Sequence, residues 1–104
     1  PKVRLVALAD AFRDRLDDCY QNITATDFKD WSGAPYGDLR KQVKIPEKNK
    51  FVGFDAYKQA IALADVVILT TPPGFRPIHF EEAVRQGKHV FMEKPVATDA
   101  VGVR

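Results

Sequence analysis

The sequence has little cysteine, no long apolar run and no large excess of either positive or negative charge. It contains one cysteine, Cys19, so it can form no internal disulfide and carries no CxxC pair for a metal or redox centre. Its longest apolar run, Val66–Leu69 with its flanks, is far shorter than the roughly 20 residues that span a bilayer. Sixteen basic and 14 acidic residues leave a net charge of +2, too small to indicate a nucleic-acid surface. We therefore expect a soluble globular protein with no metal, no membrane and no nucleic acid as partners.

Along the sequence, patterns typical of strands alternate with patterns typical of helices. A largely apolar run over residues 3–9 predicts a buried strand that is followed by Asp10. The next 13 residues carry an apolar stripe with helical spacing, formed by Phe12, Leu16, Cys19, Tyr20 and Ile23. This stripe predicts an amphipathic helix over about residues 11–23, in which Cys19 is a small buried hydrophobe rather than a nucleophile. Residues 24–50 are rich in turn signals and are interpreted as an elaborated loop.

The second half continues the alternation. Residues 51–54 predict a short strand, and Asp55 can cap a helix whose apolar face includes Ile61. Val66–Leu69 predicts a strand that is buried. A helix beginning at Pro77 and ending before Gly87 leads to a last strand over 89–92. This order of elements predicts an α/β fold with a parallel sheet and right-handed crossovers.

The last strand is followed by Glu93-Lys94-Pro95, a charged pair stopped by proline. Open α/β sheets keep their chemistry at this place, just outside the carboxyl ends of the strands. Together with Asp65–Pro73 and the helix signal Pro77–Gly87, this motif closely resembles the Gfo/Idh/MocA family. The resemblance is strong over residues 64–104 and loose over 17–50. It implies a nicotinamide-dependent oxidoreductase that acts on sugars or polyols.

The glycine-rich turn of such a fold is missing from the sequence. Dinucleotide-binding units begin with a strand and a G-x-G-x-x-G turn, with an acidic residue about 20 positions later. None of the six glycines forms this motif, and the acidic candidate is Asp10, so the turn would fall before Pro1. We therefore expect residues 1–104 to form an incomplete Rossmann-type parallel sheet lacking its first strand and glycine turn, with an insertion at about 24–50. The second (substrate) domain of the family is also absent from these residues.

The missing strand would lie at the centre of the sheet, which has consequences for pairing. In the strand order 3-2-1-4-5-6, its loss leaves strand 2 beside strand 3 and strand 4 beside strand 5, with a gap between the pairs. Buried strands cannot leave a row of backbone groups unpaired. Either strands 2 and 4 close up, another chain supplies pairing, or the missing residues exist elsewhere.

Two residues near the first strand are candidates for the adenosine half of the cofactor. Asp10 can accept hydrogen bonds from a ribose 2′-hydroxyl and would repel a 2′-phosphate, which favours NAD over NADP. The alternative is that Asp10 caps the helix that follows. Arg13 is close enough to contact adenine or phosphate, the alternative being a solvated helix arginine.

The resemblance implies further cofactor contacts from the turns after the later strands. It places Thr70, Thr71 and Pro72 under the nicotinamide-side ribose. The sequence Gly74-Phe75-Arg76 departs from the more common version with asparagine. The resemblance also makes His79 a residue lining the site, although a structural hydrogen bond is the alternative.

Lys94 is the catalytic candidate. The resemblance implies that Lys94 reaches the substrate hydroxyl, that Glu93 orders it and that Pro95 fixes the turn, with Glu93 and Pro95 counted among the cofactor-binding residues. An ammonium beside a developing alkoxide stabilises it and can relay a proton. Otherwise a lysine after a glutamate forms a surface ion pair of little energetic weight.

These observations predict part of an NAD-dependent oxidoreductase of sugars or polyols, and a homo-oligomer. We expect residues 1–104 alone to be inactive. The alternative is a non-catalytic folding or self-association module that pairs through exposed strand edges. A chain that starts inside a strand leaves open whether the protein is cytoplasmic or exported.

Overall fold

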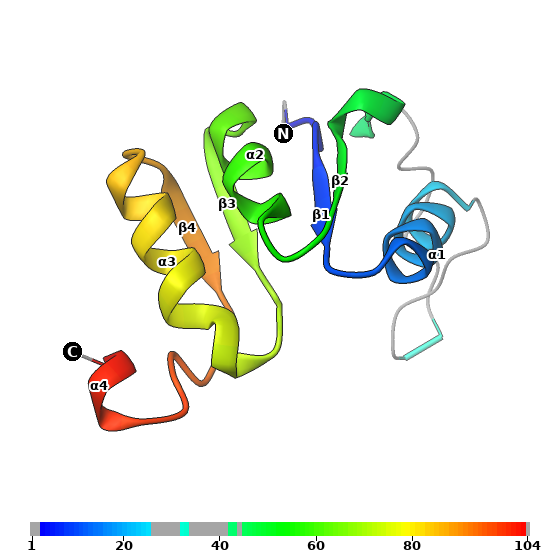
Figure 1. Cartoon of the computed structure of the whole chain (residues 1–104). Coiled ribbons are helices and arrows are strands. Elements are labelled where there is room, and N and C mark those ends of the chain that lie inside the picture. Colours follow the sequence, from blue (N-terminus) through cyan, green and yellow to red (C-terminus); the bar gives the residue numbers. More distant parts are fainter. Residues whose placement is uncertain (1–2, 26–31, 34–41, 44, 104) are drawn as a thin grey trace. The chain divides into compact units, whose positions relative to one another are not determined.

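The computed structural model describes residues 3–25, 32–33, 42–43 and 45–103 (Figure 1). The chain divides into two compact units, Pro1–Ala56 and Tyr57–Arg104, called here unit 1 and unit 2. Most of the insertion expected at about residues 24–50 lies outside the described residues. No helix in the described parts of the chain is long and apolar enough to cross a membrane.

The described part of unit 1 contains a short parallel strand pair and a long helix. Its elements are β1 (Leu8–Asp10), α1 (Arg13–Thr24), the 3₁₀ helix η2 (Glu47–Asn49) and β2 (Lys50–Val52). The strands pair in parallel from Leu8 opposite Lys50 to Asp10 opposite Val52. The predicted strand and helix are thus both present, and parallel pairing across a helix agrees with the predicted α/β class.

The first strand differs from the one predicted over residues 3–9. Regular pairing is confined to Leu8–Asp10 because its partner β2 has three residues. Further upstream, Leu5 forms only an isolated parallel bridge with Val43. Asp10 is therefore the last residue of the strand rather than the residue after it, and its carbonyl accepts a hydrogen bond of 2.9 Å from Gly53.

The stripe on α1 is only partly buried, and the prediction that Cys19 is buried is wrong. Leu16 has 1% of its surface exposed, whereas Cys19 is exposed. The covered stripe continues from Leu16 to the half-buried Tyr20 and Ile23, with spacings of four and three residues, which leaves Cys19 at its edge. Partial desolvation and the charge of Asp10 raise the pKa of the Cys19 thiol, which disfavours a nucleophilic thiolate.

Unit 2 repeats the alternation with better-formed elements. The helix α2 (Ala56–Leu63) starts at the boundary, and the elements that follow are β3 (Val66–Leu69), the 3₁₀ helix η3 (Pro73–Phe75), α3 (Arg76–Arg85), β4 (His89–Met92) and α4 (Ala100–Val103). The two strands pair in parallel from Val66 opposite His89 to Leu69 opposite Met92. In Figure 1, α3 connects the end of β3 to the start of β4 as the crossover helix.

A small apolar core holds unit 2 together. It consists of the buried residues Ile61, Val67, Leu69 and Ala83, with Tyr57, Ala64, Val90 and Met92 packed against them. The prediction of a fully buried strand at 66–69 is wrong for alternate residues. Val66 is 57% and Ile68 62% exposed, because successive side chains of a strand point to opposite faces and the core covers one face.

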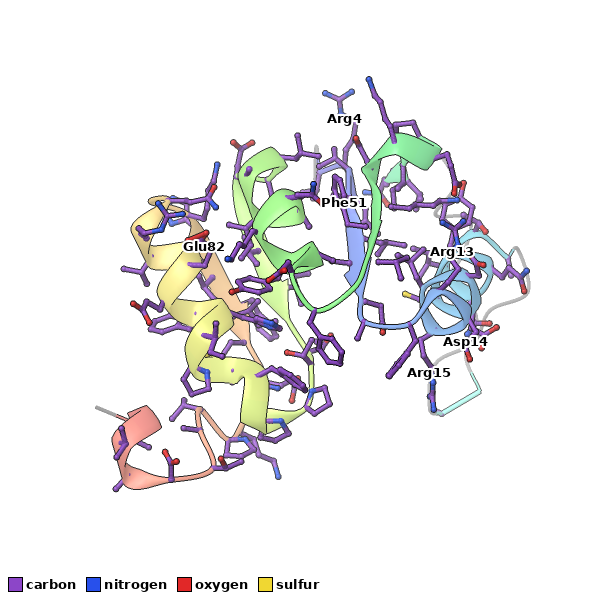
Figure 2. The ribbon with its side chains drawn as sticks, viewed as in Figure 1. Arg4, Arg13, Asp14, Arg15, Phe51 and Glu82 are labelled. Atoms are coloured by element: carbon purple, nitrogen blue, oxygen red, sulfur yellow. The ribbon has the colours of Figure 1, made fainter. Side chains whose placement is uncertain are left out.

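The ends of α3 follow from local chemistry. Pro77 lies in the first turn, where its missing N–H costs no hydrogen bond. At the other end Gly87 has φ of 72°, and the N–H groups of Gly87 and Lys88 donate to the carbonyls of Val84 and Ala83. This double hydrogen bond closes the helix and requires a left-handed residue, which glycine supplies. Within α3, the buried Glu82 accepts two hydrogen bonds of 2.6 Å from Arg85. Figure 2 labels Glu82 on this helix.

The strands of the described residues pair two by two. One sheet contains β1 and β2 and the other β3 and β4, both parallel. These are the two pairs expected from a Rossmann-type order without its central first strand. The α/β class and the two parallel strand pairs are confirmed, whereas the absence of a first strand stays a prediction.

Candidate functional site

The turns after β3 and β4 begin side by side at one edge of the sheet of unit 2. Leu69 lies opposite Met92 in the register, and the N–H of Glu93 donates to the carbonyl of Leu69 at 3.1 Å. Because the strands are parallel, Thr70 and Glu93 both leave the sheet at its carboxyl edge. The structure thus brings together the two segments that the sequence analysis selected for chemistry.

Several polar groups of the turn after β3 form hydrogen bonds with other residues of the chain. Thr70 is exposed, whereas Thr71 is half-buried. The carbonyl of Thr71 accepts a hydrogen bond from Arg76, and its hydroxyl lies 3.1 Å from Nδ1 of His79. Pro72 closes the turn by accepting a hydrogen bond of 3.0 Å from the N–H of Phe75. Of the two threonines, Thr70 is the one whose side chain is open to a ligand.

His79 is a buried residue of α3 with 8% of its surface exposed. Its ring lies 4.3 Å from that of Tyr57 and stacks on that of Phe75 at 6.0 Å between centroids. Desolvation, followed by the charge of Arg76, lowers the pKa of His79, so the imidazole is neutral at neutral pH. The hydrogen bond with Thr71 is the structural role that the sequence analysis gave as the alternative for His79. A cofactor contact by His79 stays a prediction.

Glu93, Lys94 and Pro95 form an exposed turn. The peptide bond between Lys94 and Pro95 is cis. Lys94 forms no ion pair with any other described residue, Glu93 included, so the surface ion pair considered as an alternative is not formed. The exposed ammonium of Lys94 is available to a substrate, and its catalytic role stays a prediction.

Arg76 is the residue that sequence reasoning missed. Its side chain is only 2% exposed, although it is the first residue of α3. Its guanidinium donates to the carbonyls of Thr71, Glu93 and Pro95, the last at 2.9 Å. One signal could have identified it, since a cation is unfavourable at a helix N-terminus and needs a local reason there.

Asp10 is the last residue of β1 in unit 1, and one of its two carboxylate oxygens accepts a hydrogen bond. Oδ1 accepts a hydrogen bond of 3.0 Å from the N–H of Phe12, the residue before α1. Asp10 therefore fixes the turn into the helix rather than capping its first turn directly. Its other oxygen, Oδ2, has no hydrogen-bond partner among the described residues, so one acceptor at the end of the strand is open to a ribose hydroxyl.

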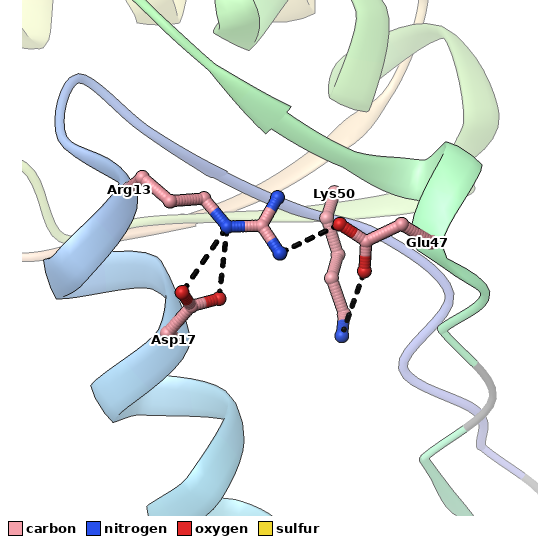
Figure 3. A network of polar contacts seen from close by, with 4 residues as sticks. All are labelled: Arg13, Asp17, Glu47 and Lys50. Atoms are coloured by element: carbon pink, nitrogen blue, oxygen red, sulfur yellow. Dashed lines mark hydrogen bonds and ion pairs between the residues drawn. The ribbon is translucent and has the colours of Figure 1, made fainter.

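Arg13 lies at the start of α1 in a network of charges (Figure 3). Lys50 is the largely buried member of this network, whereas Arg13, Asp17 and Glu47 are well exposed. Its Nε is 3.0 Å from a carboxylate oxygen of Asp17, and its Nη2 is 2.6 Å from Glu47. Glu47 also pairs with Lys50 at 3.4 Å, and the Lys50 ammonium lies 3.7 Å from the ring centre of Tyr20. The hydrogen bonds with Asp17 and Glu47 raise the pKa of Arg13. They match the solvated alternative, while a cofactor contact by Arg13 stays a prediction.

The candidate residues fall into two groups. Asp10 and Arg13 belong to unit 1, and the others to unit 2, namely Thr70, Thr71, Pro72, His79, Glu93, Lys94 and Pro95. In the described part of the chain, no group of three or more His, Cys, Asp or Glu residues could hold a metal ion.

Comparison with known proteins agrees with this organisation. A family model described as an oxidoreductase family with an NAD-binding Rossmann fold, Gfo/Idh/MocA, matches residues 1–103. No curated protein and no solved structure gave a significant match. The matched range contains unit 1, all of unit 2 except its last residue, and every candidate residue.

Proposed function

Because the chain belongs to the Gfo/Idh/MocA family of oxidoreductases, we propose that it is the nucleotide-binding part of an enzyme that transfers a hydride between a nicotinamide and a sugar or polyol. The observation that carries this proposal is the carboxyl edge of β3 and β4. There a rigid, proline-containing turn and the exposed Lys94 follow neighbouring parallel strands. Open α/β sheets bind their ligands at such an edge.

The residues present fit a dinucleotide in their chemistry. Asp10 offers an open carboxylate oxygen at the end of a parallel strand, which suits a ribose diol and disfavours a 2′-phosphate. We therefore propose NAD rather than NADP. Thr70 offers an exposed hydroxyl after β3. When bound, the nicotinamide supplies or accepts the hydride, and the protein orients it.

Lys94 would act on the substrate oxygen. Its ammonium can donate a hydrogen bond to a hydroxyl and stabilise the negative charge that develops as the hydroxyl proton passes to a base or to water. In the reverse direction, it can donate its own proton to the oxygen of a carbonyl that is being reduced. The substrate class rests on the family, whereas the assignment to Lys94 rests on its motif and on its exposure at the sheet edge.

The test is a turnover screen of the full-length protein. Purified protein is incubated with NAD⁺ or NADP⁺ and a panel of sugars, polyols and, as unrelated substrates, amino acids and primary alcohols. Formation of reduced nicotinamide with a sugar or polyol, faster with NAD⁺, is the expected result. Turnover confined to the unrelated substrates would overturn the substrate class, and faster turnover with NADP⁺ would overturn the cofactor choice.

Self-association is a second candidate, because β3 and β4 expose apolar side chains. Val66, Ile68 and Phe91 are each more than half exposed. A second copy of the chain that covered these residues would remove them from water, and we propose a homo-oligomer on this ground. Sedimentation of the full-length protein over a range of concentrations tests this, with Ile68→Lys expected to favour the monomer.

A further inference from the structure

The turn that carries Lys94 is fastened to the rest of unit 2 by one buried cation. Nη1 of Arg76 donates to the carbonyls of Glu93 and Pro95, which lie on either side of Lys94 in the chain. Nη2 donates to the carbonyl of Thr71 in the turn after β3. A single planar group therefore joins the two turns at the carboxyl edge of the sheet.

This arrangement is costly by itself. The Arg76 side chain is 2% exposed, and no carboxylate among the described residues pairs with it. Its Nε has no hydrogen-bond partner within the described structure. Burial of a guanidinium without a counter-charge is unfavourable, and so is its place at the N-terminus of α3. The three carbonyls offset this cost only because the guanidinium is planar and directs several donors in fixed directions, which lysine cannot do.

We propose that Arg76 is a positioning residue for Lys94, holding the backbone on both sides of it in the geometry that the reaction requires. This inference rests on the proposed catalytic role of Lys94. The Thr71 contact adds a link to the turn that is proposed to lie beside the cofactor. Small displacements of a catalytic group have large effects on rate, so a device that fixes a short exposed turn has kinetic consequences.

The test compares two variants of Arg76 with a control variant of the full-length protein, and repeats the Arg76 change in a Lys94→Met background. Arg76→Gln removes the charge and most donors, and Arg76→Lys keeps the charge but cannot span both turns. Arg15→Gln is the matched control, because it makes the same change at an exposed arginine on α1. Amide hydrogen exchange followed by mass spectrometry reports the order of residues 93–97 without any substrate.

In Arg76→Gln and Arg76→Lys, exchange over residues 93–97 should rise by about tenfold or more, with β3 and the rest of α3 little changed. With the substrate found in the screen, kcat should fall by about 10–100-fold at nearly constant KM. In the Lys94→Met background the same Arg76 change should cost much less, since the residue to be positioned is gone. The Arg15→Gln control should match wild type in each measurement.

Three results would overturn the inference. The first is wild-type exchange in both Arg76 variants. The second is exchange that rises equally throughout unit 2, or outright unfolding of both variants, which would make Arg76 a general structural residue. The third is an Arg76 change that lowers kcat by the same factor in the Lys94→Met background as in the wild-type protein. If Lys94→Met alone leaves kcat unchanged, the proposed role of Lys94 fails, while the exchange data still report whether Arg76 orders the turn.

Discussion

The two units contain the same strand–helix–strand pattern but are held together differently. Unit 2 has an apolar cluster that joins α2, β3 and α3, and its turns are bound by buried polar groups. In unit 1 the contacts between α1 and the segment that contains β2 include a network of exposed charges around Arg13 and Glu47. Burial stabilises more than exposed ion pairs do, so we expect unit 2 to be the more firmly ordered of the two.

This difference matches the tasks that we propose for each unit. Unit 2 contains Lys94, which needs a fixed position to act on a reacting oxygen. Unit 1 contains Asp10, which needs only to present an acceptor to a ribose. The predictions below test whether chemistry depends on unit 2 and cofactor choice on unit 1.

Lys94→Met should have the largest effect. Methionine resembles the aliphatic part of lysine but has no charge, so packing is kept and alkoxide stabilisation is lost. We expect kcat and kcat/KM of the full-length enzyme to fall together by about 10²–10⁴-fold, with little change in cofactor affinity. Lys88→Met, in the turn before β4, is the control. Normal kcat with weaker substrate binding would make Lys94 a docking residue, and full activity would remove its catalytic role.

Ile61→Ala should reduce the free energy of unfolding by about 2–5 kcal/mol, because it leaves a cavity in the core of unit 2. Ile61 is 2% exposed, whereas Leu63 on the same helix is 49% exposed. Leu63→Ala should therefore cost less than about 1 kcal/mol. Urea unfolding measures both, and equal costs would mean that the apolar cluster does not dominate the stability of unit 2.

Asp10→Ala should weaken NAD binding by roughly 1.5–3 kcal/mol through loss of a charge-assisted hydrogen bond, and should relieve repulsion of NADP. Calorimetric titration of the full-length protein with both cofactors measures the change. The exposed Asp14 in the first turn of α1 provides the control, Asp14→Ala. If Asp10→Ala folds and keeps the wild-type preference, Asp10 serves only the turn into α1.

His79 should make unit 2 sensitive to mild acid. Burial lowers the pKa of His79 below its ordinary value of 6.5 in the folded protein. Below pH 6.5 the unfolded chain then binds more protons at this position than the folded one, so stability falls as the pH drops below that value. His79→Gln should flatten this dependence in thermal unfolding, and an unchanged dependence in this variant would contradict the assignment.

Arg13→Gln should have the smallest effect. The ion pairs of Arg13 with Asp17 and Glu47 are exposed, so water and salt screen them. We expect a slight decrease in melting temperature at low salt that vanishes at high salt. The contact with Arg13 lowers the pKa of Glu47 below 4.5, so this contribution is present at neutral pH and is lost as the pH falls through that lowered value. A decrease that persists at high salt would contradict the assignment.

Local patterns sufficed for much of the fold. The periodicity around Ile61 predicted the buried face of α2, and Pro77 and Gly87 predicted the ends of α3. These features depend on residues within a few positions of one another, where backbone sterics and helix hydrogen bonding decide the outcome. The motif around Lys94 likewise predicted the family.

Features that depend on contacts distant in sequence were decided only by the tertiary structure. Cys19 follows the helical spacing yet is exposed, because the face that α1 buries runs from Leu16 to Tyr20. Arginine is usually a surface residue, so the residue type alone does not predict that Arg76 is buried. Its burial follows from three carbonyls, 5, 17 and 19 positions away, that come together when β3 and β4 pair. The sequence by itself thus determined the order of elements, the family and the turn that carries Lys94. The tertiary structure decided how that turn is held, because hydrogen bonds between separate turns form only once the strands have set their register.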